Sequence, residues 1–301
     1  MRKFLFLIFI SLISFQAQST HLMGGEITWQ CLKSGPDVGK YVFTLKVYRD
    51  CSGVPASAFT QFLDVWGHPT INQISMNFVG QEDVSPNCNP VISGNPVLSC
   101  VNGDVGAVEE YTYESLPINI PGIPPATGWH FTWDNCCRNG AITNLVLSNT
   151  TSPSEGFTLR AGMFPFIDPA TGFAVPADPC FDSSPNFKEQ PKTILCVGFP
   201  FSYSHNASDE ELDSLVYSWG EPLDDNVPFT GGVYNPGPFP ATPSTLPFML
   251  PYSANSPLPG NPTLDSQTGE VSYNANLAGF YVTCVRVQAY RCSQLIAEVY
   301  R

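Results

Sequence analysis

The chain has 301 residues and a formal net charge of −13, with 13 lysine and arginine residues against 26 aspartate and glutamate residues. So few basic residues cannot build a phosphate-neutralising patch, which makes nucleic acid and anionic membrane surfaces poor partners. Hydrophobic residues form 43% and aromatic residues 13% of the chain, which is not the composition of a disordered protein. The 29 prolines and 24 glycines indicate short strands joined by irregular loops.

The N-terminus has the pattern of a secretory signal peptide over residues 1–19. Residues 2–3 are basic, residues 4–15 are apolar, and residues 17–19 offer a small-residue cleavage site. The apolar run is too short to span a membrane, and no later stretch approaches the roughly 18 apolar residues that spanning requires. We therefore expect a mature chain from Thr20 that is secreted or displayed at the cell surface, without a transmembrane segment.

Downstream of the signal, long helical periodicity is nearly absent. Short runs rich in Val, Ile, Thr, Tyr and Phe lie between clusters of Gly, Pro, Asn and Asp, which is typical of an all-β protein. The clearest expected strand is KYVFTLKVYR at 40–49, where alternate side chains are apolar. The other expected strands are 25–31, 61–66, 74–79, 108–116, 129–133, 141–148, 156–163, 193–203, 279–290 and 294–300. A turn is expected at 265–269 and an irregular connector at 117–127.

The texture of the sequence changes near residue 190. Residues 20–190 predict an N-terminal β-rich domain with most of the cysteines, and residues 191–301 fit one immunoglobulin-like sandwich. The expected fold class is therefore all-β, with two β-sandwich-like domains and proline-rich loops.

Ten cysteines in an exported chain are most simply five disulfides. They are Cys31, Cys51, Cys88, Cys100, Cys136, Cys137, Cys180, Cys196, Cys284 and Cys292. Neighbouring Cα atoms lie about 3.8 Å apart, below the usual disulfide range of roughly 4.4–6.8 Å, so Cys136 and Cys137 each need a distant partner. No C-x-x-C pair is present, which argues against a zinc or redox centre.

Proximity in the sequence suggests a pairing scheme, although sequence alone does not fix connectivity. The short-range candidates are Cys88–Cys100, Cys180–Cys196 and Cys284–Cys292. In that scheme Cys31 and Cys51 are left for Cys136 and Cys137, in either order.

An ordered set of segments along the mature chain resembles a known family. The segments are HLMGGEIT at 21–28, LKVYRDC at 45–51, CCRN at 136–139, the Cys180/Cys196 pair around SSP at 183–185, and DSLVY at 213–217. They resemble the N-terminal region of large exported Bacteroidetes proteins with a gliding-motility-associated C-terminal sorting domain. The resemblance implies cell-surface or secreted proteins with tandem immunoglobulin-like modules, and no established enzymatic activity.

The chain departs from that family at its C-terminus. It ends at Arg301 without the sorting domain, which leaves two alternatives open: a fragment of a longer protein with further domains, or a protein that is not anchored. The second half separately resembles cadherin-like and immunoglobulin-like modules.

Asp209, Glu211 and Asp213 occupy positions i, i+2 and i+4, a spacing that can bring three carboxylates toward one Ca²⁺ ion. Further oxygen ligands would come from Asp224, Asp225 or Asp265. The alternative is a solvated acidic loop, which Leu212 favours because many such calcium loops have a glycine there. Apart from this possible Ca²⁺, no cofactor is expected.

No common catalytic motif is present, so we expect a non-catalytic protein that binds a protein or a surface glycan. The alternative is a carbohydrate-binding or carbohydrate-active protein. Its candidate groups are the carboxylates Glu109, Glu110, Asp224 and Asp225, and the aromatic rings of Trp29, Trp66, Trp129, Trp133 and Trp219. For each tryptophan, the simpler interpretation is a place in the core.

Overall fold

The fold is known from a computed structural model, which describes residues 22–85, 98–104, 106–135, 138–148, 155–191, 195, 197–224 and 245–301. The expected signal peptide lies outside these residues. Among the described residues, no helix has the length and apolar character needed to cross a membrane.

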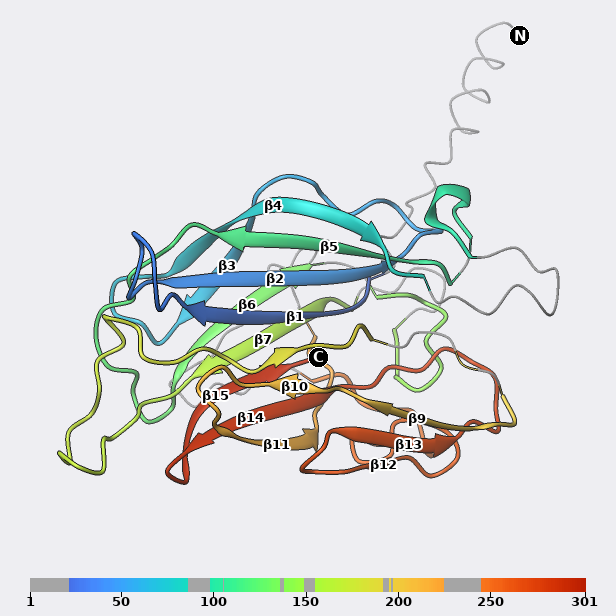
Figure 1. Ribbon diagram of the computed structural model, residues 1–301. Helices are drawn as coiled ribbons and strands as arrows, with labels where there is room; N and C mark the ends of the chain where they lie inside the picture. The colour runs from blue at the N-terminus through green and yellow to red at the C-terminus, as the bar shows by residue number, and fades with distance from the viewer. Residues whose placement is uncertain are drawn as a thin grey trace, which may run out of the picture.

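Ten strands form one antiparallel sheet in the spatial order β1-β2-β5-β4-β3-β6-β7-β15-β14-β11. Their bounds are β1 Leu22–Cys31, β2 Tyr41–Asp50, β3 Gln61–Trp66, β4 Gln73–Asp83, β5 Val108–Ser115, β6 Trp129–Asn135, β7 Phe157–Met163, β11 Ser214–Trp219, β14 Val285–Arg291 and β15 Gln294–Tyr300. The sheet curls until β1 contacts β7 and β15 (Figure 1). The all-β, sandwich-like fold class is confirmed.

Two small sheets lie beside the large one. The strands β9 (Pro200–Ser204), β12 (Thr263–Leu264) and β13 (Glu270–Asn274) form a three-stranded sheet, and β8 (Asn186–Phe187) pairs with β10 (Ala207–Ser208). A 3₁₀ turn, η1, covers Cys100–Asn102. In Figure 1 β9, β12 and β13 lie at the lower right, and β10 lies below β1.

The core lies inside the curl of the large sheet and is rich in aromatic rings. Along β2, Tyr41, Phe43, Leu45 and Val47 are buried while the alternating residues from 42 to 46 are half-buried, as the period of two predicts. The ring of Trp29 lies 6.1 Å from that of Phe43 and 5.8 Å from that of Phe131. The rings of Phe43 and Phe131 lie 4.6 Å apart, so these aromatic pairs join β1, β2 and β6.

Strands from both sides of residue 190 share the large sheet. Beyond β7 the sheet continues with β15, β14 and β11, and Ala297 on β15 pairs with Met163 on β7. The inward residues Val285, Val287 and Ala289 of β14 belong to the same buried cluster as the core of the first half. Position 190 therefore does not separate two sheets, although the sequence suggested a domain boundary there.

Three expected strands differ in the structure. Residues 141–148 form only isolated bridges. The segment is held instead by the side chain of Asn144, whose amide donates to Pro257 O and Val282 O and whose oxygen accepts from Val282 N. In the expected strand 193–203, residues 193, 194 and 196 are outside the described set, and the paired strand is β9, which begins only at Pro200. The expected strand 279–290 begins only at Val285.

The turn at 265–269 is confirmed. Gly269 donates its N–H to Asp265 O at 3.0 Å, and the Asp265 carboxylate accepts from the backbone N–H groups of Gln267 and Thr268 at 2.8 Å each. Gly269 has φ +68°, and a Cβ there would lie 2.5 Å from the Tyr217 ring. Both facts require glycine at this position.

The structure contains the disulfides Cys31–Cys180 and Cys51–Cys100, over sequence separations of 149 and 49 residues. The expected pairs Cys88–Cys100 and Cys180–Cys196 are wrong, because Cys100 and Cys180 have other partners. For the same reason Cys31 and Cys51 do not pair with Cys136 and Cys137. These last two cysteines, with Cys88 and Cys196, lie outside the described residues.

The expected pair Cys284–Cys292 is also wrong, since both cysteines are free. The extended strand β14 separates them, and eight residues at about 3.3 Å each place their Cα atoms roughly 25 Å apart. Proximity in the sequence is a poor guide here because strands carry neighbouring cysteines apart and the curl of the sheet brings distant ones together.

Candidate functional site

The three carboxylates of the expected calcium loop are each engaged by a different partner. Asp209 Oδ1 accepts the backbone N–H groups of Glu211 and Asp213, both at 3.0 Å. Glu211 pairs with Lys33 at 2.8 Å, and Asp213 pairs with Arg291 at 2.7 Å. The carboxylates therefore do not converge on one point, and the described part of the chain holds no group of three His, Cys, Asp or Glu side chains that could bind a metal ion.

Arg291 organises the acidic side chains at this end of the molecule. Its Nη2 lies 2.6 Å from Asp182 and 2.7 Å from Asp213, and its guanidinium lies over the rings of Phe166 and Phe181. Burial raises the pKa of Asp182 well above its usual range, and the charge of Arg291 opposes that shift. This cluster ties the end of β14 to β11 and to the segment before β8, which is a structural role.

The carboxylates proposed for a carbohydrate-active protein also have separate partners. Glu109 and Glu110 are neighbours on β5 and point to opposite faces of the sheet. Glu109 pairs with Arg49 at 2.7 Å, and Glu110 pairs with Lys46 at 3.1 Å. Asp224 accepts the backbone N–H of Gly156 at 2.8 Å, and Asp225 lies outside the described residues.

Most of the tryptophans that were candidates for stacking on sugars lie in the core instead, as the simpler interpretation predicts. Trp29, Trp129 and Trp133 are buried. Trp66 and Trp219 are half-buried, and the indole N–H of Trp66 donates to Thr132 Oγ1 at 2.9 Å.

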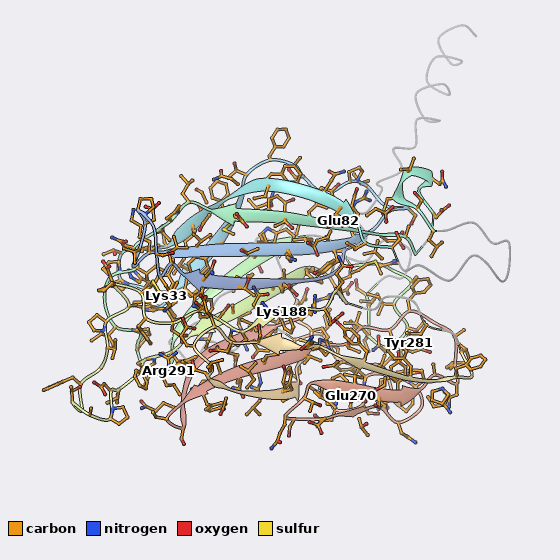
Figure 2. All side chains as sticks on the ribbon, viewed as in Figure 1. Lys33, Glu82, Lys188, Glu270, Tyr281 and Arg291 are labelled. Carbon is orange, nitrogen blue, oxygen red and sulfur yellow. A yellow bond between two sulfur atoms is a disulfide. The ribbon has the colours of Figure 1, made fainter. Side chains whose placement is uncertain are left out.

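A polar pocket lies where the outer face of β1 and β2 meets the segment that carries β8 and β10. Its volume is about 280 Å³. The described residues that line it are Thr28, Trp29, Gln30, Thr44, Ser183, Ser184, Asn186, Lys188, Ser208 and Glu210. Figure 2 labels Lys188 between β1 and β10.

The alternation of β1 explains the polar floor of the pocket. Ile27, Trp29 and Cys31 point into the core, so Thr28 and Gln30 point outward. Thr28 is the direct cross-strand partner of Thr44 on β2, which places two hydroxyl groups side by side. Trp29 contributes to the lining, but its indole ring packs in the core against Phe43 and Phe131.

The wall of the pocket is fixed by hydrogen bonds along the open edge of β1. Ser184 Oγ accepts the backbone N–H of Trp29 at 2.9 Å, and Ser184 N donates to Trp29 O at 3.0 Å. Ser183 Oγ accepts the N–H of Cys31 at 3.1 Å. The disulfide Cys31–Cys180 joins the same two segments covalently, so the pocket is preformed.

Glu210 closes one end of the pocket. Its Oε2 accepts from Gln30 Nε2 at 3.4 Å and from Ser183 Oγ at 3.1 Å. On the other wall Asn186 stands directly opposite Ser208 in the β8–β10 pair. The side chains of Asn186, Lys188 and Glu210 are exposed, so they are accessible to a ligand from solvent.

A second depression, of about 450 Å³, lies over β9 and β13. Its polar side chains already bond to one another: Ser202 Oγ donates to the Glu270 carboxylate, and the hydroxyls of Ser202 and Ser272 are 3.0 Å apart. It is also open, which makes it a weaker candidate than the pocket beside β1.

Most of the pocket could not be identified from the sequence. Residues 183–185 stand out there only through the family resemblance, and the carboxylates flanking Glu210 only as possible calcium ligands. Nothing in the sequence places Thr28 and Thr44 beside residues 183–210, because that contact depends on how the chain returns over β1.

No protein-family model matches this chain, and searches of curated proteins and of solved structures each gave no match.

Proposed function

We propose that this chain is an exported, non-catalytic binding module of a cell-surface or secreted protein, as the resemblance to gliding-motility-associated proteins implies. The observation that carries the proposal is the preformed polar pocket beside β1. Fixed hydroxyl, amide and charged groups in a concave site are the usual means of orienting a ligand. The disulfides Cys31–Cys180 and Cys51–Cys100 are compatible with an extracellular location.

The pocket favours binding over hydrolysis within the carbohydrate alternative. Glycoside hydrolysis commonly uses two carboxyl groups about 5–10 Å apart. Among the described lining residues, Glu210 is the one carboxylate, and it already accepts hydrogen bonds from Gln30 and Ser183. A carbohydrate-binding role therefore stands as the more specific form of the proposal.

The proposal is tested with the mature chain, residues 20–301, labelled and applied to a glycan array and to intact bacterial and host cells. Hydrolysis of the same glycans is followed in parallel. The proposal predicts saturable binding without product formation. Turnover of a glycan, or the absence of saturable binding to every surface, would contradict it.

A further inference from the structure

We propose that the pocket between β1, β2, β8 and β10 binds one uncharged sugar residue. This inference rests on the proposed binding function and adds the class of ligand and the residues that recognise it.

The size of the pocket suits a ligand of one ring. Pockets for drug-sized ligands have volumes of about 300–1,000 Å³, whereas this one has about 280 Å³. The pocket is therefore suited to a ligand no larger than a single pyranose ring. A disaccharide would extend into solvent past the exposed side chains of Asn186 and Lys188.

The lining supplies both donors and acceptors, which is what a sugar hydroxyl group requires. The hydroxyls of Thr28, Thr44 and Ser208 and the carboxamide of Asn186 can each donate and accept. Lys188 adds a donor, and Glu210 adds acceptor capacity. The pocket has little apolar surface because the ring of Trp29 packs in the core. An apolar ligand would therefore have few apolar side chains to contact.

The charge around the pocket disfavours acidic ligands. Lys188 and Glu210 balance each other in the lining. Beside Glu210 in the sequence, Asp209 is buried and accepts backbone N–H groups, and Glu211 pairs with Lys33 at 2.8 Å. A ligand carboxylate would lie near the carboxylate of Glu210, and the whole chain carries a net charge of −13. Uncharged sugars avoid that repulsion.

The rigidity of the site lowers the entropy cost of binding. Ser184 makes two hydrogen bonds with the backbone of Trp29: its Oγ accepts from Trp29 N–H, and its N–H donates to Trp29 O. The floor of the pocket is formed by the paired strands β1 and β2 of the large sheet. Preorganisation of this kind lets weak individual hydrogen bonds give a measurable affinity. Without aromatic stacking the affinity for one sugar is modest, and display of several copies at a surface would raise the avidity.

The test is a calorimetric titration of the mature chain with galactose, mannose, N-acetylglucosamine and glucuronic acid. We expect binding of at least one of the three uncharged sugars and at least tenfold weaker binding of glucuronic acid. The double variant Asn186→Ala/Ser208→Ala should weaken the preferred sugar at least tenfold, about 1.4 kcal/mol. Asn186 is exposed and Ser208 is half-buried, so the fold should survive both changes.

The matched control is Asn77→Ala, because Asn77 is an exposed asparagine on β4, away from the pocket lining. It should leave the affinity within twofold of the unsubstituted chain. Three results would overturn the inference: no heat with any sugar, equal affinity in the pocket variant, or preferred binding of glucuronic acid. If the chain still binds cells whose glycans have been oxidised with periodate, the binding function holds and only the sugar assignment fails.

Discussion

The side chain of Arg301, which directly follows β15, is buried against residues of the first half of the chain. Its Nε lies 2.7 Å from Glu26 Oε2, it stacks over the ring of Phe187 at 4.5 Å, and it donates to Glu189 O at 2.6 Å. Burial raises the pKa of Glu26, and the charge of Arg301 opposes that shift. Such a buried pair contributes mainly to specificity, since desolvation offsets much of its attraction.

Removing one member of this pair should therefore be costly. Arg301→Met leaves the Glu26 carboxylate buried without its partner, and we expect a loss of about 3–5 kcal/mol in the free energy of unfolding. The double variant Glu26→Gln/Arg301→Met should recover a substantial part of that loss. Urea denaturation of the three chains measures both values, and a loss below about 1 kcal/mol for Arg301→Met would contradict a buried ion pair.

His205 should make stability depend on pH. Burial, and secondarily the charge of Arg301, lower its pKa to about 3. Below the usual histidine pKa of about 6.5, the unfolded chain binds a proton that the folded chain excludes, so stability is lost as the pH falls from about 6.5 toward 3.

For His205 alone, this linkage predicts a fall of about 2 kcal/mol in the free energy of unfolding between pH 7 and pH 5. His205→Phe should keep the edge-on contacts with Phe187 and Tyr203 and remove that part of the pH dependence. Denaturant titrations of both chains at the two pH values measure the difference. Parallel pH profiles would show that His205 does not carry the effect.

At the scale of elements, the edge of β1 is capped by side chains in place of a further long strand. Ser183 and Ser184 satisfy the N–H groups of Cys31 and Trp29. An uncapped edge strand exposes such groups to pairing with other chains.

Ser184→Ala should leave the buried Trp29 N–H without its acceptor and lower the free energy of unfolding by about 1–3 kcal/mol. The control Ser75→Ala changes an exposed serine on β4 and should cost less than about 0.5 kcal/mol. Thermal and urea unfolding give both numbers. Equal effects of the two changes would contradict a specific role for the cap.

The long-range disulfide should stabilise the chain through the same junction. Cys31→Ser/Cys180→Ser opens a loop of 149 residues, and we expect a loss of about 2–5 kcal/mol in the free energy of unfolding. Peptide mapping without reduction should recover a Cys31–Cys180 fragment and a Cys51–Cys100 fragment. A map that joins Cys31 to another cysteine would contradict this arrangement.

Strands could be predicted where local alternation decides their formation. Gln61–Trp66 and Gln294–Tyr300 coincide with the expected ranges, and β2 differs by one residue at each end. Residues 141–148 were mispredicted because the side chain of Asn144 takes its bonds from distant carbonyls, which no local pattern records. The disulfide pairs were mispredicted because the bonds join cysteines that are 149 and 49 residues apart in the sequence, and proximity in the sequence does not indicate such partners.

For the whole molecule, one curled sheet joins residues from both sides of position 190. The buried faces of β14 and β15 complete the core formed by β1, β2, β6 and β7. The pocket also lies between distant segments, with hydrogen bonds that span about 150 residues, such as Ser183 to Cys31. Single-sequence patterns cannot predict such a site, because each half of it looks like an ordinary polar surface.

The shared sheet predicts that residues 191–301 do not fold alone. Expressed separately, this fragment would expose the backbone edge of β15 that pairs with β7 in the whole chain. We therefore expect the fragment to show no cooperative unfolding transition. The mature chain should unfold in one transition. A fragment with a cooperative transition and a dispersed amide NMR spectrum would instead support two independent domains.

If the pocket beside β1 is the binding site, a site-resolved titration will place the ligand there. Amide NMR spectra of the labelled mature chain are recorded while the preferred uncharged sugar is added. We expect saturable shifts confined to residues 28–30, 44, 183–188 and 208–210. An unchanged spectrum, or shifts centred on β9 and β13, would contradict it.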